Sequence, residues 1–331
     1  AGHQVRTGGI SSDLQAKNTI FVVSDPYNYC IYSGSGTYRG NYNDFFTVNG
    51  GFVGFNENPL PALSDWQKVV AQDTNSLSHD PLFAGADDFH VMSVQGRYTP
   101  DGSWTNDSVH SPCIDAGEPG AASTYTNEPA PHGNRANVGA YGSMAEASMS
   151  NTNGWLTALT FNDGGLARSP LALRWIYGGG LSGTVTLEYS PDNGTNWLTI
   201  ASGVPITANT YSWSTTNHSS SALWRISQGA VTDVVDQVFI LNPDSFYVND
   251  EFTDGDVFCT APGTNSNRGV RPDAPAATVQ DLLAFNDLEG GDTVYVDVGY
   301  YLLTNNIVIG SSDSGGGLAR LVRIWGNMGT T

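Results

Sequence analysis

Short apolar runs, broken by Gly, Asn, Asp or Ser, set the pattern of the first sixty residues. Four of these runs predict strands at residues 18–24, 29–34, 44–48 and 51–55. The runs recur roughly every ten to twelve residues, a spacing compatible with a β-sandwich or with a solenoid of stacked strands. The pattern therefore indicates β-structure and leaves these two architectures open.

One segment of this half has a helical period instead. Residues 63–73 place Leu63, Trp66 and Val70 on one face of a short helix. We expect Ser64 to cap its N-terminus, with Gln67 completing a capping box. Such a helix would lie against the flank of the β-structure.

The pattern changes between residues 154 and 242, where longer runs of alternating apolar and polar residues appear. Six runs predict strands at residues 171–179, 183–190, 197–203, 210–215, 222–228 and 237–241. Strands at this spacing indicate an antiparallel β-sandwich, similar to immunoglobulin-like or fibronectin-like modules. The octapeptide SPDNGTNW (190–197) resembles the Asp box of sialidases. We interpret it as a hairpin-folding device, because the motif lies away from the chemistry of those enzymes.

The last ninety or so residues return to short runs. A strand is predicted around the sequence YVND (247–250), and a helix near 278–286 has Val279, Leu282, Leu283 and Phe285 as apolar positions. Gly290 and Gly291 are expected to end this helix, and GDTVYVD (291–297) follows as a strand.

Two stretches of the N-terminal half carry a family resemblance. DPLF (80–83), DFHV (88–91), SPCIDAG (111–117) and RANVGAYG (135–142) resemble the terminator of right-handed parallel β-helix domains in large bacterial extracellular and surface proteins. That family shares the fold of pectate lyases. Residues 244–331 resemble the opposite end of such a domain, its cap and first coils.

The resemblance implies three parts: the last coils and terminator of a parallel β-helix (1–149), an immunoglobulin-like β-sandwich (150–243), and a β-helix start (244–331). We therefore expect an all-β protein in which each β-helix segment has one uncapped end. Residues expected at the two ends are Ala1, Val5 and Ile10, and Leu321, Val322, Ile324 and Trp325. Joining the C-terminal segment of one copy to the N-terminal segment of the next would complete a β-helix and propagate as a fibre. The copies in such a fibre would be either separate chains or successive repeats of one tandem polypeptide.

The charge composition of the chain argues against nucleic acids and anionic membranes as binding partners. The chain has 32 acidic and 13 basic residues, a net charge of −19, so it lacks the cationic surface that nucleic acids require and that anionic membranes attract. No stretch approaches a transmembrane helix, and the first residues lack an apolar signal region, so a mature or internal segment of an extracellular protein is expected. Cys30, Cys113 and Cys259 are expected to be buried free thiols, with an intermolecular disulfide as the alternative.

One cluster of acids is a candidate calcium site. Asp250, Glu251, Asp254 and Asp256 crowd one turn, and Ca²⁺ there would stiffen the link to the last segment. The alternative is that these side chains cap local turns.

An enzyme is the less favoured interpretation. A pectate-lyase-like enzyme needs carboxylates for Ca²⁺ and a basic residue that abstracts a proton. The candidates, Asp13, Asp25, Asp44, Asp292 and Asp297 with Arg6, Lys17 and Arg39, form no recognisable catalytic cluster, and solvated surface roles are expected for them. His90 and His110 are expected to pack or hydrogen-bond near the terminator.

The function we expect is structural: a repeat unit of an extracellular filament, surface stalk or giant adhesin that binds copies of itself. Two alternatives stay open. The first is a glycan-binding adhesin, with Tyr27, Tyr29, Tyr32, Tyr300 and Tyr301 as candidate stacking residues. The second is a polysaccharide lyase or hydrolase.

Overall fold

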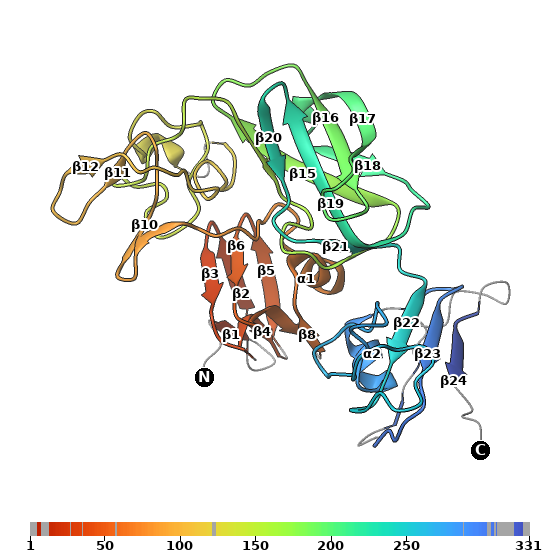
Figure 1. Cartoon of the computed structure of the whole chain (residues 1–331). Helices are drawn as coiled ribbons and strands as arrows, with labels where there is room; N and C mark the ends of the chain where they lie inside the picture. The colour runs from red at the N-terminus through yellow and green to blue at the C-terminus, as the bar shows by residue number, and fades with distance from the viewer. Residues whose placement is uncertain are drawn as a thin grey trace. The chain divides into compact units, whose positions relative to one another are not determined.

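The computed structural model describes residues 5–7, 13–26, 28–34, 36–56, 58–120, 124–286, 288–302, 306–307, 309 and 321–326. These residues form an all-β structure with two short α-helices (Figure 1). The chain divides into two compact units, residues 1–216 with 221–239, and residues 217–220 with 240–331. The boundary predicted at 149/150 falls inside the first unit, and the one at 243/244 lies near the division between units.

Short strands open the first unit in two successive sets. The first strand set is β1 (Val5–Thr7), β2 (Asp13–Lys17) and β3 (Ile20–Val23); the second strand set is β4 (Tyr29–Ser33), β5 (Thr37–Asn41) and β6 (Asp44–Thr47). Each strand of the first set pairs in parallel with its counterpart in the second, and β4 pairs in parallel with β7 (Phe52–Asn56). The pairing partners are roughly two dozen residues apart in the chain.

Apolar side chains from both sets share one core. Phe21 of β3 stacks on Phe45 of β6 at 5.2 Å between ring centroids, and both rings are buried. The strands predicted at 18–24, 29–34, 44–48 and 51–55 are confirmed as β3, β4, β6 and β7. Strands β2 and β5 escaped prediction because DLQAK and TYRGN have few apolar residues.

Helix α1 (Leu63–Val70) covers the end of this core with the fully buried Trp66. The predicted cap at Ser64 is wrong, because the helix already begins at Leu63 and Ala62 is its N-cap. The Leu63 amide donates instead to Asp163, a hundred residues further along, at 2.7 Å. Asp65, not Gln67, accepts from the N-cap amide.

Short strands lie on both sides of this helix in the chain. Before it, β8 (Asn58–Leu60) pairs antiparallel with β7. Two hairpins follow, β9 (Phe83–Gly85) with β10 (Asp88–Val91), and β11 (Arg97–Tyr98) with β12 (Trp104–Thr105). Phe83 and Val91 of the first hairpin join a second buried cluster that includes Leu77, Cys113 and Val138.

Two antiparallel sheets follow in residues 155–241 and contain all six strands predicted there. One sheet has the order β13 (Trp155–Ala158), β15 (Leu171–Gly178), β18 (Thr210–Trp213). The other has the order β14 (Leu166–Ala167), β21 (Phe239–Leu241), β19 (Ser219–Gln228), β16 (Thr184–Ser190), β17 (Leu198–Pro205), with β20 (Val231–Val234) beside β19. Tyr189 and Trp213 contact across the sheets, with ring centroids 4.8 Å apart.

The second unit has a parallel sheet of its own. Strands β22 (Ser245–Val248), β23 (Thr293–Val296) and β24 (Arg323–Gly326) pair side by side in that order (Figure 1). Helix α2 (Val279–Phe285) has the predicted position and buries Val279 and Leu282. Thr278 caps its N-terminus by accepting from the Asp281 amide. The helix ends at Phe285 with Asn286 as its C-cap, ahead of the glycines that were expected to end it.

Candidate assembly edges

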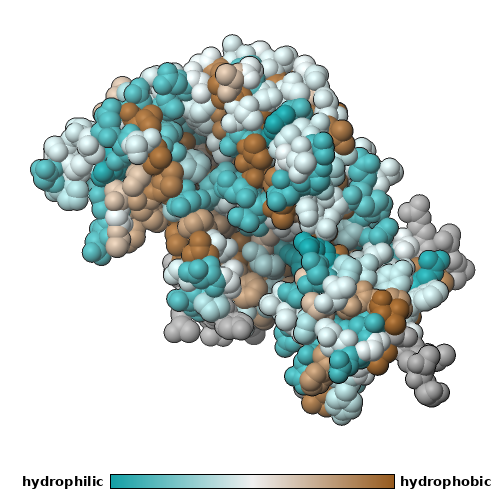
Figure 2. All heavy atoms as spheres, in the orientation of Figure 1, coloured by the Kyte–Doolittle hydropathy of each residue, from teal (hydrophilic) through white to brown (hydrophobic). Residues whose placement is uncertain are grey.

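Strand β24 leaves one side of the second unit's sheet open in the part that the structure describes. Phe246, Val294 and Ile324 occupy one register row across the three strands. The first two are fully buried, whereas Ile324 is 45 % exposed. Beside it, Leu321 and Trp325 are 56 % and 58 % exposed. Hydrophobic side chains are visible on the surface in the region of β23 and β24 (Figure 2).

The opposite side of the same sheet is closed. The amide of Tyr247 donates to Gly269 O, and the amide of Ala276 donates to Tyr247 O at 3.0 Å. The amide of Asn249 donates to Ala276 O at the same distance. Leu282 of α2 lies in the core cluster with Phe246 and Val294. Covering by a loop and a helix is how proteins protect a sheet edge from pairing with other chains.

The first unit has the reverse arrangement. Among the described residues, β1, β2 and β3 each have a strand neighbour on one side only. Leu14 of β2 is in register with the buried Tyr38 and packs partly buried against the core. Val5 lies in β1 opposite Ile31, while Ala1 and Ile10 lie outside the described residues.

The second strand set is closed on its far side. The amide of Phe45 donates to Leu77 O at 2.9 Å, and the amide of Leu77 donates to Asn43 O at 2.8 Å. Helix α1 covers the neighbouring strand β7, where Gly54 leaves space for the Trp66 ring. Among the described residues, the parallel strands of each unit thus have one covered side and one side without a strand neighbour.

A buried hydrogen-bond network holds the covered side of the second strand set in place. The carboxylate of Asp73, 1 % exposed, accepts from Tyr38 Oη at 2.8 Å and Trp66 Nε1 at 2.9 Å. Its other oxygen accepts from Asn43 Nδ2 at 2.9 Å and Ser76 Oγ at 2.8 Å. No local sequence signal marks Asp73, because its partners come from a strand, a turn and the helix.

A second buried network joins the strand sets to the antiparallel sheets. Asn162 Nδ2 donates to Ser78 O and to Asp236 Oδ2, each at 2.9 Å, and lies 3.2 Å from His79 Nδ1. The amide of Asp236 donates back to Asn162 Oδ1 at 3.0 Å. His79 Nε2 reaches Ala158 O at 3.0 Å. These bonds explain why the two parts belong to one compact unit.

The four residues of the predicted calcium site lie on one loop, where the side chains of Asp250 and Asp256 make separate contacts. Asp250 accepts from the amides of Phe252 and Tyr300, and Asp256 accepts from Asn249 Nδ2. No group of three or more His, Cys, Asp or Glu side chains within the described ranges has metal-binding geometry. The contacts of Asp250 match the turn-capping alternative, and calcium binding stays a prediction.

Three of the candidate lyase carboxylates are buried, so the solvated roles expected for them are wrong. Asp44, Asp292 and Asp297 are at most 3 % exposed. Burial alone would raise the pKa of Asp297. The net pKa is nevertheless lowered, because hydrogen bonds from the amides of Val257, Phe258 and Cys259 stabilise the carboxylate. The exposed candidates pair individually: Lys17 with Glu118, and Asp13 with Arg39. Asp25 is exposed, and the side chain of Arg6 lies outside the description.

The interior also holds a thiol beside a carboxylate. Cys113 Sγ lies 3.3 Å from Asp44 Oδ2, and the His79 amide donates to Asp44 Oδ1 at 3.0 Å. Burial raises the pKa of Asp44 to about 7 and raises the pKa of the Cys113 thiol well above its usual range. A thiol that is buried and protonated is unreactive, because the nucleophile is the exposed thiolate. Cys30, Cys113 and Cys259 are all free and buried, as expected.

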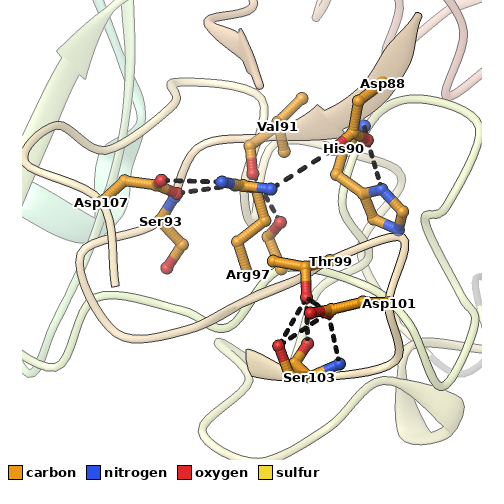
Figure 3. Close-up of polar contacts among 10 residues, drawn as sticks. Asp88, His90, Val91, Ser93, Arg97, Thr99, Asp101, Ser103 and Asp107 are labelled. Carbon is orange, nitrogen blue, oxygen red and sulfur yellow. Dashed lines mark hydrogen bonds and ion pairs between the residues drawn. The ribbon is translucent and has the colours of Figure 1, made fainter. Parts of the chain in front are cut away.

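The hairpins of the predicted terminator carry an ion-pair network (Figure 3). Arg97 binds Asp107 through two nitrogens at 2.9 and 3.1 Å and reaches Asp88 at 3.4 Å. His90 Nδ1 contacts Asp88 Oδ1 at 2.6 Å, and its ring stacks on Tyr141 at 3.5 Å. The expected packing role of His90 is confirmed. This network fixes the hairpins.

The remaining motifs are structural as well. In the Asp box, Asp192 accepts from Ser190 Oγ and from the Asn196 amide, each at 2.8 Å, which confirms the hairpin interpretation. The candidate sugar-stacking tyrosines are not one group: Tyr29 and Tyr32 belong to the first unit, and Tyr300 and Tyr301 to the second. Tyr27 lies outside the described residues.

None of the described helices has the length and apolar character needed to cross a bilayer. Comparison of the chain with family models, with curated proteins and with solved structures finds no match.

Proposed function

We propose that this protein is a structural repeat unit of an extracellular filament or surface stalk. In this proposal both parallel parts are segments of right-handed parallel β-helices, and an immunoglobulin-like sandwich lies between them in the chain. The open edge at β24 of one copy is completed by the open first strand set of the next copy. The partner is therefore a second copy of the same chain, or the next repeat of a tandem polypeptide.

The observation that carries the proposal is the opposite placement of open and covered sides. In the described part of the second unit the last strand, β24, has a strand neighbour on one side only, and the first strand, β22, is covered on its other side. In the first unit each described strand of the first set has a strand neighbour on one side only, and the second set is covered on its far side. The two strand sets pair with each other in parallel, as do β22, β23 and β24, so a further parallel strand fits each open edge. If β24 of one copy is followed by the first strand set of the next copy, all strands across the junction run in the same direction, as in one continuous parallel stack.

The same edges supply the free energy of association. An unpaired strand edge is a template for strand addition, and complete burial of an aliphatic side chain contributes about 1.5–3 kcal/mol. Ile324, Trp325 and Leu14 are the side chains with surface still to bury. Because the two edges differ, the contact is heterologous and repeats from copy to copy.

Blocking one edge at a time tests the proposal. Ile324→Lys places a charge at the β24 edge, and Leu14→Lys places one at the first strand set. The long lysine side chain lets the charge reach water while its stem covers the core, so each variant is expected to fold. Circular dichroism and a thermal transition check the fold before sedimentation velocity measures association.

Wild-type protein is expected to form oligomers whose size grows with concentration. Either variant alone is expected to stay monomeric, and an equimolar mixture is expected to stop at heterodimers, because only one compatible junction remains. Val69→Lys, on an exposed helix position, is the matched control and should assemble like the wild type.

Monomeric wild-type protein at high concentration would overturn the proposal, as would dimers of Leu14→Lys alone, which would indicate a symmetric β24–β24 contact. Negative-stain electron microscopy of native material, with mass analysis under denaturing conditions, then separates the two forms. Filaments that dissolve to 35.1 kDa chains indicate separate subunits, and filaments that stay larger indicate a tandem chain.

A further inference from the structure

Strand β24 of one copy has three candidate partners in the first unit of the next copy: β1, β2 and β3. The side chains that face the core and the surface in each of the three sheets distinguish these candidates. Resting on the proposed function, we infer that β24 of one copy adds in parallel to β1 of the next, with Ile324 opposite Val5 and Trp325 opposite Arg6. The occupant is thus a second copy in one defined register.

The second unit supplies the pattern that must continue. Its inward row runs through Phe246, Val294 and Ile324. Its outward row holds Tyr247 and Tyr295, whose rings stack at 5.6 Å and 22°, and Trp325 occupies the next position of that row. The ladder therefore alternates an aliphatic or aromatic core position with an aromatic surface position.

The β1–β4–β7 ladder repeats this pattern. Tyr32 of β4 stacks on Phe55 of β7 at 4.7 Å and 7°, and both rings are only partly buried. The neighbouring Ile31 is fully buried, next to Gly54 in the register. Val5 pairs with Ile31 and Arg6 with Tyr32. Matching core row to core row and aromatic row to aromatic row sets Ile324 against Val5.

The other two ladders do not fit. The outward positions of the β2–β5 ladder are polar, with Gln15 and Arg39 exposed and in register. In the β3–β6 ladder the stacked aromatic pair, Phe21 and Phe45, lies in the buried core instead of on the surface. A slip of one residue on β1 is also excluded, because it would exchange the core and surface faces of β24.

Disulfide trapping tests the register. Neighbouring strands lie about 4.8 Å apart, within the separation that a disulfide spans. The double variant Gly326→Cys with Thr7→Cys places thiols at adjacent register positions and keeps Trp325. A Cβ at position 326 has open space around it. The comparison variants combine Gly326→Cys with Gln15→Cys in β2 or with Val22→Cys in β3. Wild-type protein, whose three thiols are buried, is the control.

After mild oxidation, non-reducing electrophoresis is expected to show a ladder of covalent oligomers only for the variant with Thr7→Cys. A ladder from Gln15→Cys or Val22→Cys in its place overturns the register and leaves the proposed function intact. The same holds if none of the three crosslinks while sedimentation shows oligomers. If wild-type protein forms no oligomers at all, the proposed function itself fails.

Discussion

Ile324 lies directly beside Val294 in the parallel pairing of β23 and β24, yet Val294 is fully buried and Ile324 is 45 % exposed. Both side chains belong to the same inward row, so the difference comes from their neighbours. Val294 has a strand on each side, whereas Ile324 has one on a single side among the described residues. This contrast locates the edge strand of the sheet among the described residues.

Assembly should strengthen with salt. Each chain carries a net charge of −19, so approaching copies repel each other over distances that added salt screens. The contacts we propose are apolar and backbone contacts, which screening does not weaken. We expect sedimentation equilibrium to show a several-fold higher association constant at about 0.5 M than at about 0.05 M sodium chloride. A lower constant at high salt would instead indicate a junction built from ion pairs.

Asp73→Asn should destabilise the first unit. All four groups around the Asp73 carboxylate are donors, so an amide would place its own N–H₂ against two of them. Leaving buried polar groups unsatisfied should lower the free energy of unfolding by about 2–4 kcal/mol. Urea titration followed by tryptophan fluorescence measures it. The exposed Asp25→Asn is the control and should change little; equal effects of the two variants would contradict the network.

Asp44 should make stability depend on pH. Burial raises its pKa in the folded state to about 7, well above the usual value of an aspartate. Its contribution to stability is therefore complete below the unfolded pKa and is lost as the pH rises through 7. Asp44→Asn stays neutral, so the variant should gain stability relative to the wild type between pH 4 and pH 8, by up to roughly 4 kcal/mol. Urea titrations of both proteins across this range test it, and parallel stability curves would refute it.

Asn162→Ala should loosen the connection between the strand sets and the antiparallel sheets. The substitution leaves the Ser78 carbonyl and the Asp236 amide without their partner. We expect the free energy of unfolding to fall by about 2–3 kcal/mol, and faster proteolysis between residues 148 and 154. Asn106→Ala, at an exposed position, serves as the control. Unchanged proteolysis together with unchanged stability would show that this network does not hold the parts together.

The sequence by itself determined the all-β class, the two helices and half of the 24 described strands. These features depend on local periodicity: Leu63 and Trp66 are apolar at helical spacing, and Val294 and Val296 alternate with Tyr295 wherever the strand is placed. The same local rule failed for β2 and β5, whose residues are polar on the exposed face. There the pairing of neighbouring strands, not composition, decides the conformation.

Only the tertiary structure decided which polar groups meet and which edges remain open. The Leu63 amide is capped by Asp163, and Asp73 gathers donors from four separate positions, because hydrogen-bond partners distant in sequence leave no local pattern. The exposure of Ile324 is of the same kind. Its apolar character was evident from the sequence, but whether a neighbouring strand covers it depends on the order of strands in the sheet, and that order is a property of the folded chain.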